Sequence, residues 1–346
     1  MDKIHYDISK LDGYNRAFNM IVSPRNDGKT TAVLDKCFNA FERFGSPFLL
    51  ITRRIVEITD QYIDSLQEIH NKFHPDKLYH LTYNSSDLDK GIVDVWQDGQ
   101  LFCRVIALSK PLKTLKGLFI KNAKYMLFDE FIINTRMGEK YLPDEGFKFK
   151  EMFNTFLREN YGLKAYFCGN PYTWFSPYYV AFGIDVSKCP MGKITAGDVW
   201  ALDRHLLSDE LKAFIKAHNP TYNEEDEYSR YAIEGYAVND ANIRVSSAQP
   251  QGFKYAFSFV VDSRRIDFYK NQDYHDRETR FWACISKRTD KDAFCFDFKD
   301  LATGNRLFAR DDRFRFSFLK EAIRNRLVVY ESLECDYLTE GVYSTL

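Results

Sequence analysis

The sequence predicts a three-layer α/β domain with a mostly parallel sheet, followed by a smaller α+β domain. Short, fully apolar segments alternate with amphipathic segments over the first ~200 residues, a pattern typical of buried parallel strands covered by helices. After Pro190 the pattern changes, and strand-like segments dominate from about residue 245. The 346 residues, of which 45% are apolar and 16% aromatic, are enough to build more than one core.

The first expected elements surround a polar loop. FNMIV (18–22) has the unbroken apolar character of a buried strand. From 29 to 44, apolar residues recur at helical spacing, and Gly45 is a residue type that commonly ends a helix. PFLLITR (47–53) is expected to form a second buried strand, and residues 55–73 a second helix.

The next expected elements complete the α/β alternation. VDVWQ and LFCRVIAL flank the turn DGQ, which predicts a β-hairpin. KYMLFDEF (124–131) and KAYFCGN (164–170) are expected to be buried strands, and a helix is expected between them at 147–158. Strands separated by helices in this way favour parallel pairing.

The second half contains a helix, a linker and a sheet. Residues 208–219 are expected to form a helix capped by Ser208, and NEEDE (223–227) is the best candidate for an exposed linker. Four segments have strand character, and a helix is expected near 316–326. The four strand segments are FKYAFSFVVD, RIDFYK, RFWACISK and AFCFDFK.

These patterns divide the chain into a first domain at 1–205, a helical and acidic linker region at 206–244 and a second domain at 245–346. The net charge of −1 disfavours a uniformly basic nucleic-acid coat protein, although it leaves a local basic channel open. Seven cysteines without a CxxC pair indicate reduced intracellular thiols. Because no signal-peptide core and no apolar run near the roughly 20 residues of a membrane span are found, we expect a soluble protein without a membrane partner.

The polar loop at 23–28 has the layout of a phosphate-binding loop. Such a loop follows a strand, presents backbone N–H groups and opens a helix whose dipole faces an anion. Lys29 is placed to reach the β- and γ-phosphates of ATP, and the Thr30 hydroxyl to ligate Mg²⁺. Ser23 replaces the usual first glycine, and an ordinary helix start is the alternative. The expected ATP-binding residues are Ser23, Arg25, Asn26, Asp27, Gly28, Lys29, Thr30 and Thr31.

Two acidic residues at the end of the 124–131 strand support this interpretation. In a P-loop ATPase, an acid at that point holds Mg²⁺, here Asp129, and the next one, Glu130, polarises the attacking water. A DE pair also simply marks the exposed end of many buried strands. Its combination with a correctly placed GKT about a hundred residues upstream is much rarer, so we predict an ATPase that uses Mg²⁺.

Two further residues are candidates for contacts with the nucleotide. Asn170, at the tip of the following strand, can contact the γ-phosphate or the lytic water, although GNP is also a strong turn signal. Tyr14, just before the first strand, can stack on adenine, and a packing role is equally compatible with its position.

Basic residues are the remaining candidates. Arg25, Arg53 and Arg158 can neutralise the charge that develops on a transferred phosphoryl group, although a single arginine is usually a solvated surface residue. The lysines of SKPLKTLKG can contact a DNA backbone or merely keep a loop soluble. They are Lys110, Lys113 and Lys116.

His70 and His74 have the spacing of metal ligands on one helix face. No third ligand lies near them in sequence, so a zinc site is not predicted there. The cysteines form no pattern typical of a nucleophile.

The order of these motifs resembles that of one family. YNRAFNMIVSPRNDGKTT, LLITRR, KYMLFDEF, TFLREN and CGNPY follow one another as in the DNA-packaging ATPases of small podoviruses of the salasvirus type, encapsidation proteins related to terminase large subunits. The resemblance covers the first ~200 residues by motif and the remainder more weakly. In terminase-like proteins the loop often starts with a small residue other than glycine and carries an early arginine, as Ser23 and Arg25 do here.

The resemblance implies a RecA-like P-loop ATPase that works as a ring of five subunits in the host cytoplasm. The ring would sit at the portal vertex of a prohead and drive double-stranded DNA inward, with the portal (connector) protein and a scaffold RNA as partners. Arg158 falls at the position of the trans-acting arginine finger, and Arg53 at that of an arginine that restrains the catalytic glutamate. Lys116 falls near a second trans-acting basic residue, and Asn170 in the motif that couples hydrolysis to movement.

For the second domain the resemblance implies an RNase H-like fold that has lost its nuclease function. Asp262 and Asp267 lie near the ends of successive strands, and Asp290, Asp292 and Asp297 follow. We assemble no metal-binding triad from them and interpret Asp262 and Asp267 first as turn and surface residues. Two alternatives stay open: a terminase with an active metal-dependent nuclease, and a P-loop assembly protein that does not hydrolyse ATP.

Overall fold

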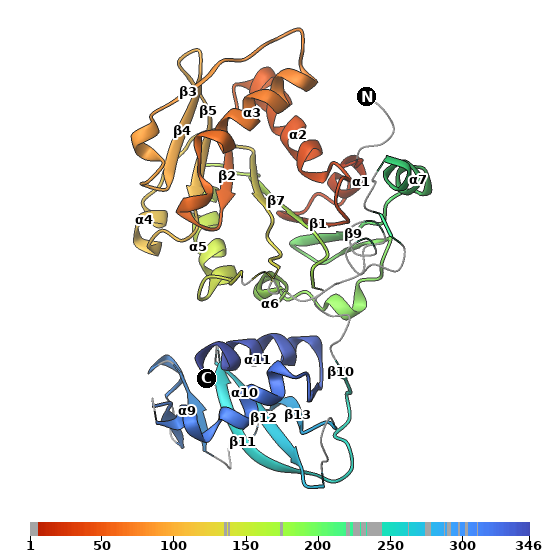
Figure 1. Ribbon diagram of the computed structural model, residues 1–346. Coiled ribbons are helices and arrows are strands. Elements are labelled where there is room, and N and C mark those ends of the chain that lie inside the picture. The colour runs from red at the N-terminus through yellow and green to blue at the C-terminus, as the bar shows by residue number, and fades with distance from the viewer. Residues whose placement is uncertain are drawn as a thin grey trace. The chain divides into compact units, whose positions relative to one another are not determined.

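The computed structural model divides the chain into two compact units, Met1–Val238 and Asn239–Leu346, which are described separately (Figure 1). The helical and acidic region predicted at 206–244 falls mostly within the first unit, and the predicted three-part division stays a prediction. The described residues are 6–134, 137, 139–173, 176–218, 222–223, 229, 233, 244–261, 263–273, 278–286, 288, 292–296, 298–301, 304–309 and 311–346.

A nine-stranded sheet with the order β3-β4-β5-β2-β6-β7-β1-β9-β8 forms the middle of the first unit. The six strands from β5 to β9 in that order run parallel, and β3, β4 and β8 pair antiparallel at the two edges, so the predicted mostly parallel sheet is confirmed. The strands are β1 Phe18–Val22, β2 Phe48–Thr52, β3 Leu81–Tyr83, β4 Ile92–Gln97, β5 Gln100–Ala107, β6 Tyr125–Asp129, β7 Lys164–Gly169, β8 Ile194–Ala196 and β9 Trp200–Arg204.

Helices cover both faces of this sheet, which gives the predicted three layers (Figure 1). Along β1, Ile21 belongs to the core under α2 and α3, whereas Met20 and Val22 belong to the core under α5 and α6. This alternation follows from the two-residue period of a strand. The helices are α1 Ser9–Asp12, α2 Lys29–Phe44, α3 Asp60–Phe73, α4 Leu112–Lys116, α5 Glu145–Leu157, α6 Pro177–Phe182 and α7 Asp209–His218.

The β4–β5 hairpin is confirmed, with a two-residue turn at Asp98 and Gly99. Both residues have positive φ, 50° and 77°, which is the backbone that a twisted two-residue hairpin requires. The helix expected after residue 207 is also confirmed, because Ser208 Oγ accepts the Leu211 N–H at 3.2 Å before α7. The predicted acidic linker lies outside the described residues except for Asn223.

The helix predicted at 55–73 is wrong at its start. A short 3-10 turn spans Ile55–Glu57, and the α-helix begins only at Asp60. Thr59 is extended, and its hydroxyl accepts the Tyr62 N–H at 3.1 Å. This cap satisfies a backbone donor that the first turn of a helix leaves unpaired, so the chain starts a new helix there.

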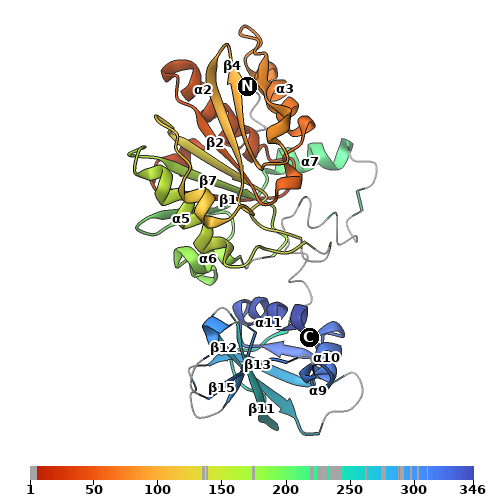
Figure 2. The ribbon, with the colours of Figure 1, turned by 90° about the vertical axis from the view of Figure 1, so that its left-hand side faces the viewer.

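The second unit contains a seven-stranded mixed sheet with the order β10-β16-β13-β12-β11-β14-β15. Helices α10 and α11 lie against it (Figure 2). Leu319 of α10 and Leu338 of α11 belong to one core cluster with Phe259 and Phe268 of the sheet. All four predicted strands are present, and the α+β class is confirmed; the RNase H-like assignment stays a prediction. The elements are β10 Arg244–Val245, β11 Phe253–Val261, β12 Arg264–Asn271, β13 Phe281–Ser286, β14 Ala293–Cys295, β15 Asn305–Leu307, α9 Asp312–Arg315, α10 Ser317–Arg324, β16 Val328–Tyr330 and α11 Leu333–Thr345.

None of the helices among the described residues has the length and apolar character that crossing a membrane demands.

Candidate nucleotide-binding site

The predicted phosphate loop connects the carboxyl end of β1 to the start of α2. Gly28 has φ 80° and Asn26 φ 64°, left-handed values that turn the chain sharply into the helix. Glycine takes this conformation without strain, which explains why Gly28 directly precedes Lys29. Ser23 is buried, and its N–H donates to the Gly169 carbonyl on β7 at 3.2 Å. A small residue therefore suffices at the start of this loop.

Lys29 turns back into the loop that precedes it. Its Nζ donates to Asn170 Oδ1 at 2.9 Å and to the carbonyl oxygens of Ser23 and Pro24 at 3.4 and 3.3 Å. The side chain is buried, and a buried ammonium is costly unless polar groups surround it. The Lys29 ammonium group is thus held at the loop by hydrogen bonds. Asn170, which is predicted to be a sensor, contacts it directly.

Thr30 and Asp129 meet across the carboxyl edge of the sheet. Thr30 Oγ1 donates to Asp129 Oδ1 at 3.0 Å, although the two residues are 99 positions apart. The pKa of the Asp129 carboxyl is raised to about 6, mainly by burial and to a smaller degree by the nearby Glu130 charge, while Lys29 opposes the shift. A hydroxyl and a carboxylate are the hard oxygen ligands that Mg²⁺ prefers, so these residues fit the predicted metal.

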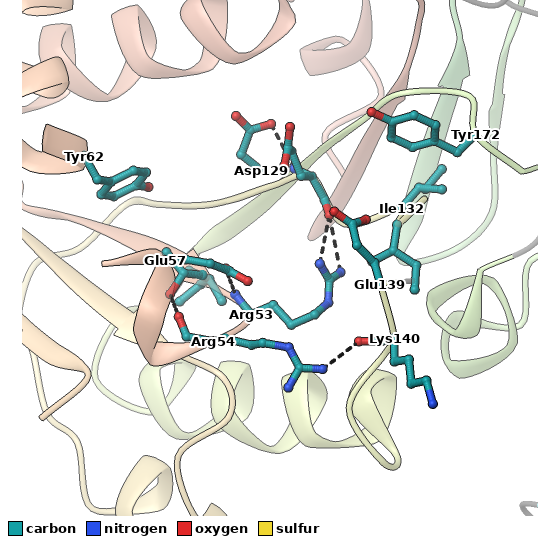
Figure 3. A pocket seen from close by; sticks show the side chains of 13 residues that line it. Arg53, Arg54, Glu57, Tyr62, Asp129, Ile132, Glu139, Lys140 and Tyr172 are labelled. Atoms are coloured by element: carbon teal, nitrogen blue, oxygen red, sulfur yellow. Dashed lines mark hydrogen bonds between the residues drawn. The ribbon is translucent and has the colours of Figure 1, made fainter. Parts of the chain in front are cut away.

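Glu130 directly follows Asp129 and is exposed. Its φ of 54° is unusual for a residue with a side chain and is stabilised by a hydrogen bond from its N–H to Asp129 Oδ1 at 3.0 Å. Glu130 and Asp129 line a cavity of about 670 Å³ beside the loop, a size suited to a small-molecule ligand (Figure 3). The other lining residues are Ile51, Thr52, Arg53, Arg54, Glu57, Tyr62, Ile132, Ile133, Glu139, Lys140 and Tyr172.

Arg53 anchors the segment that carries Glu130. Its guanidinium donates to the main-chain carbonyls of Glu130 (3.2 and 3.3 Å) and Phe131 (3.1 Å), and Figure 3 shows it pointing toward the chain that follows Asp129. Its Nε pairs with the fully buried Glu145 carboxylate at 3.0 Å. The structure therefore places Arg53 on the backbone of Glu130 and Phe131, whereas its predicted restraint of the glutamate side chain stays a prediction.

The remaining loop residues lie around this centre. Arg25 is exposed and donates to the Tyr172 hydroxyl at 2.7 Å, which links the loop to the segment that follows Asn170. Thr31 is partly buried in the first turn of α2. Tyr172 lines the cavity and was missed from the sequence, where the GNPY turn carries no sign of that role.

Tyr14 and Arg158 lie at the opposite edge of the sheet. Tyr14 precedes the amino end of β1, whereas the loop follows its carboxyl end. A five-residue strand spans about 16 Å, so the position of Tyr14 does not favour the predicted stacking on adenine. Arg158 is exposed, ends α5 and precedes β7, whose carboxyl end leads to Asn170. Its position is remote from the loop of its own subunit.

The three lysines predicted to bind DNA lie on and before the short helix α4. Lys113 and Lys116 are exposed, and Lys110 is partly buried. Lys116 Nζ pairs with Glu151 of α5 at 2.5 Å, with half of the lysine side chain exposed. The salt bridge holds this lysine on its own subunit, while DNA contact by the group stays a prediction.

A cluster of polar side chains beside the loop has no signal in the sequence. Asp27 is buried, its Oδ1 lies 3.7 Å from His205 Nε2, and burial raises the pKa of its carboxyl. The Tyr6 hydroxyl donates to Asp203 at 2.8 Å, and its ring meets His205 edge-on. β9 brings Asp203 and His205 next to β1, where they had no sequence signal. Tyr6, whose N–H donates to the Asp27 carbonyl at 2.9 Å, thus lies beside the loop, as Tyr172 does and Tyr14 does not.

In the second unit, the interpretation of Asp267 as a surface residue is wrong. Asp267 lies in β12, is buried, and accepts hydrogen bonds from Ser258 Oγ at 2.5 Å and Arg265 Nε at 2.8 Å. The arginine offsets the cost of burying this charge. Asp292 is exposed, and among the described residues of this unit no three acidic, histidine or cysteine groups converge on a metal position. Asp262, Asp290 and Asp297 lie outside the described residues.

Comparison with known proteins identifies the family and the fold. The model of the podovirus DNA encapsidation protein (Gp16) family matches residues 1–343. The chain belongs to this family. A curated relative, a DNA packaging protein of Bacillus phage PZA, is 24% identical over 271 residues, which cover 76% of this chain and 74% of the relative.

Two solved structures share the fold over nearly the whole chain. The first, the bacteriophage Phi-29 viral genome packaging motor assembly, has a TM-score of 0.64 at 18% identity and covers 99% of both chains. The second, the Phi-28 gp11 DNA packaging motor, has a TM-score of 0.63 at 15% identity and covers 94% of both. The expected family and fold class are confirmed by these matches, which extend through the second unit.

Proposed function

We propose that this chain is the ATP-hydrolysing subunit of a motor that moves double-stranded viral DNA into a preformed prohead. The observation that carries the proposal is the convergence of Lys29, Thr30 and Asp129 at one edge of the sheet, with the 3.0 Å bond between Thr30 and Asp129. Family membership and the names of its relatives, DNA packaging proteins, supply the substrate class.

The chain's own residues divide the chemistry among them. When bound, Mg²⁺ neutralises charge on the phosphate oxygens, and Thr30 and Asp129 would hold it. Lys29 stabilises the same charge from the loop. Glu130, exposed in the cavity, is placed to orient the attacking water. Asn170 reports the state of the site, because a γ-phosphate that attracts Lys29 competes with the 2.9 Å bond between them.

Arg158 is proposed to act on the nucleotide of a neighbouring subunit. It sits at the amino end of β7, and the six residues of that strand separate it from the Asn170 edge by about 20 Å. An arginine that is exposed and remote from its own loop is suited to a site in trans. Arg53 is proposed as a positioning residue that fixes the backbone of Glu130.

The wider assembly follows as a further part of the proposal. We propose a ring of five subunits, in the host cytoplasm and at the portal vertex during packaging, with the portal protein, double-stranded DNA and a scaffold RNA as partners. The support is the motor assembly among the similar structures. The second unit is proposed to be an RNase H-like domain without nuclease activity, supported by the neutralised Asp267.

The test is steady-state ATP hydrolysis by wild type and Glu130→Gln, with and without double-stranded DNA at matched protein concentrations. We expect activity that rises with DNA and is lost in the variant by at least about 100-fold, the scale of general-base catalysis. Activity that ignores DNA would contradict the motor, and activity that survives in Glu130→Gln would contradict the catalytic assignment. Magnesium- or manganese-dependent cleavage of plasmid DNA would show that the second unit is an active nuclease.

A further inference from the structure

A second polar cluster lies between α2 and the end of α3, among residues that the nucleotide site does not use. Glu42 of α2 meets His70 and His74, and one ligand atom from each of the three lies within 4.8 Å of the others. The two histidines lacked a third ligand in sequence. The packing of α2 on α3 supplies Glu42 as a third ligand, although it lies 28 positions before His70 in the sequence. A metal site, which the sequence did not predict, is therefore reconsidered on the structure.

The three ligand atoms have separations that suit one small metal ion. His70 Nε2 lies 2.9 Å and His74 Nδ1 3.2 Å from the same oxygen, Glu42 Oε1. In tetrahedral Zn²⁺ sites with bonds of about 2.0–2.1 Å, neighbouring ligand atoms are about 3.3 Å apart. All three ligand atoms lie within 4.8 Å of one another, so side-chain shifts can bring them onto one ion.

The ring nitrogens that point away from Glu42, His70 Nδ1 and His74 Nε2, each lie beside a hydrogen-bond acceptor. The Tyr79 N–H donates to Asn71 Oδ1 at 2.7 Å, and Asn71 Nδ2 donates to the Tyr79 carbonyl at 3.1 Å, which fixes the amide orientation. The same Oδ1 lies 3.1 Å from His70 Nδ1, so that nitrogen carries a proton. His74 Nε2 faces the Asp35 carboxylate at 3.2 Å, an acceptor of the kind that orients metal-binding histidines.

The point between Glu42 Oε1, His70 Nε2 and His74 Nδ1 is suited to a cation. In the neutral rings, the inner nitrogens His70 Nε2 and His74 Nδ1 carry lone pairs, and both point at a carboxylate oxygen of Glu42. One divalent cation at the centre would accept a lone pair from each of these three atoms.

We propose that Glu42, His70 and His74 form a Zn²⁺ site that clamps α2 onto α3. Two imidazoles and one carboxylate favour Zn²⁺ over Mg²⁺, which prefers oxygen ligands. Asn71 and Asp35 act as the outer partners that metal-binding histidines usually have. His70 is fully buried, whereas Glu42 and His74 keep 17% and 15% of their side-chain surface exposed, which gives metal and a fourth, water ligand a way in.

Zinc binding to the full-length, tag-free protein tests this site. After treatment with a chelator, the protein competes for Zn²⁺ with a chromophoric zinc indicator in excess Mg²⁺. We expect one Zn²⁺ per chain, and affinity at least about 100-fold weaker in His74→Asn and in Glu42→Gln, since each loses one of three ligands. Asp35→Ala, which removes only an outer partner, is expected to weaken binding by about 10–100-fold.

Thermal unfolding supplies the second readout. Zn²⁺ is expected to raise the Tm of wild type and of His80→Asn, whose histidine is exposed and outside the cluster, but not that of His74→Asn. Far-UV circular dichroism checks that each variant is folded, and Glu42→Gln serves if His74→Asn is not. The proposal is overturned if wild type binds no Zn²⁺, if a folded ligand variant binds it as tightly, or if Mg²⁺ raises Tm equally.

Discussion

At the scale of single residues, the site combines groups that are useful for chemistry and unfavourable for folding. Asp129 is a carboxylate in a place where burial disfavours its charge, and Glu130 has a left-handed backbone that few residues with side chains adopt. Such strain is common at functional sites because the rest of the fold holds it in place. A substitution that removes either feature should therefore raise the stability of the protein and lower its ATPase activity.

Asp129→Asn should stabilise the protein free of nucleotide and metal while abolishing hydrolysis. The folded pKa of about 6 exceeds the ordinary 3.8, so the unfolded state ionises first as pH rises. Wild type consequently loses stability between about pH 4 and 6, and the neutral amide of the variant has no such loss. We expect the Tm of the variant to exceed that of wild type above pH 6, with a gain that shrinks toward pH 4. A gain independent of pH would contradict this account.

Arg53 offers a second prediction at this scale. Arg53→Met leaves the Glu145 carboxylate, which has no exposed surface, without its cation. Losing one partner of a buried ion pair costs about 3–5 kcal/mol. The free energy of unfolding, measured with urea, should therefore fall by that amount in the variant. Lys90→Met is the matched control, because the Lys90–Asp87 pair lies at the surface and its loss should change little. Equal effects of the two substitutions would contradict the structural importance of Arg53.

At the scale of elements, close packing between helices positions the catalytic segment. α5 begins at Glu145, which accepts the Leu142 N–H at 2.7 Å and the Tyr178 hydroxyl of α6 at 2.8 Å. The first turn of α5 therefore links α6 to Arg53 and, through it, to Glu130. Gly146 in this turn lets the two helices approach closely.

Gly146→Ala should be destabilising even though alanine is the better helix former. A Cβ at this position would lie 2.6 Å from the Ala181 side chain and 3.0 Å from the Pro177 carbonyl. Overpacking of this kind costs about 1–3 kcal/mol, which urea unfolding measures. Gly117→Ala, where the nearest atom is 3.5 Å away, should be neutral or slightly stabilising. An equally stable Gly146→Ala would show that α5 and α6 can separate without cost.

At the scale of the whole molecule, each unit has its own core, and the candidate nucleotide-binding site lies within the first. The chain supplies the phosphate loop, the carboxylates and Asn170 at one edge of the sheet, whereas Arg158 lies at the other. If Arg158 acts on the nucleotide, as we propose, a neighbouring subunit has to supply it, which is the physical argument for a ring.

Mixed rings test that argument. Arg158→Ala and Glu130→Gln subunits should each be inactive, because one lacks the trans-acting cation and the other the residue that orients water. In mixtures, interfaces that join an intact glutamate to an intact arginine should recover part of the ATP hydrolysis. DNA-stimulated turnover over a titration of the two variants measures this. Mixed rings that form without recovering activity would place Arg158 in a cis or structural role.

Local sequence signals alone predict the candidate nucleotide-binding site and the order of the main elements. Gly28, Lys29, Thr30 and the Asp129–Glu130 pair are such signals, because a strand, a loop and a helix start are each encoded by adjacent residues. Apolar periodicity likewise predicts the strands of the parallel sheet, apart from β9, whose short WALDR segment has no distinctive pattern.

Tertiary packing determines which distant residues meet. β9 pairs with β1 and brings His205 to Asp27, and the packing of α2 on α3 brings Glu42 to His70. It also puts Tyr14 at the edge away from the loop. These outcomes depend on strand order and helix packing, which arise from the fit of whole elements against one another. Because this fit involves residues far apart in the chain, no short sequence pattern predicts which of them meet.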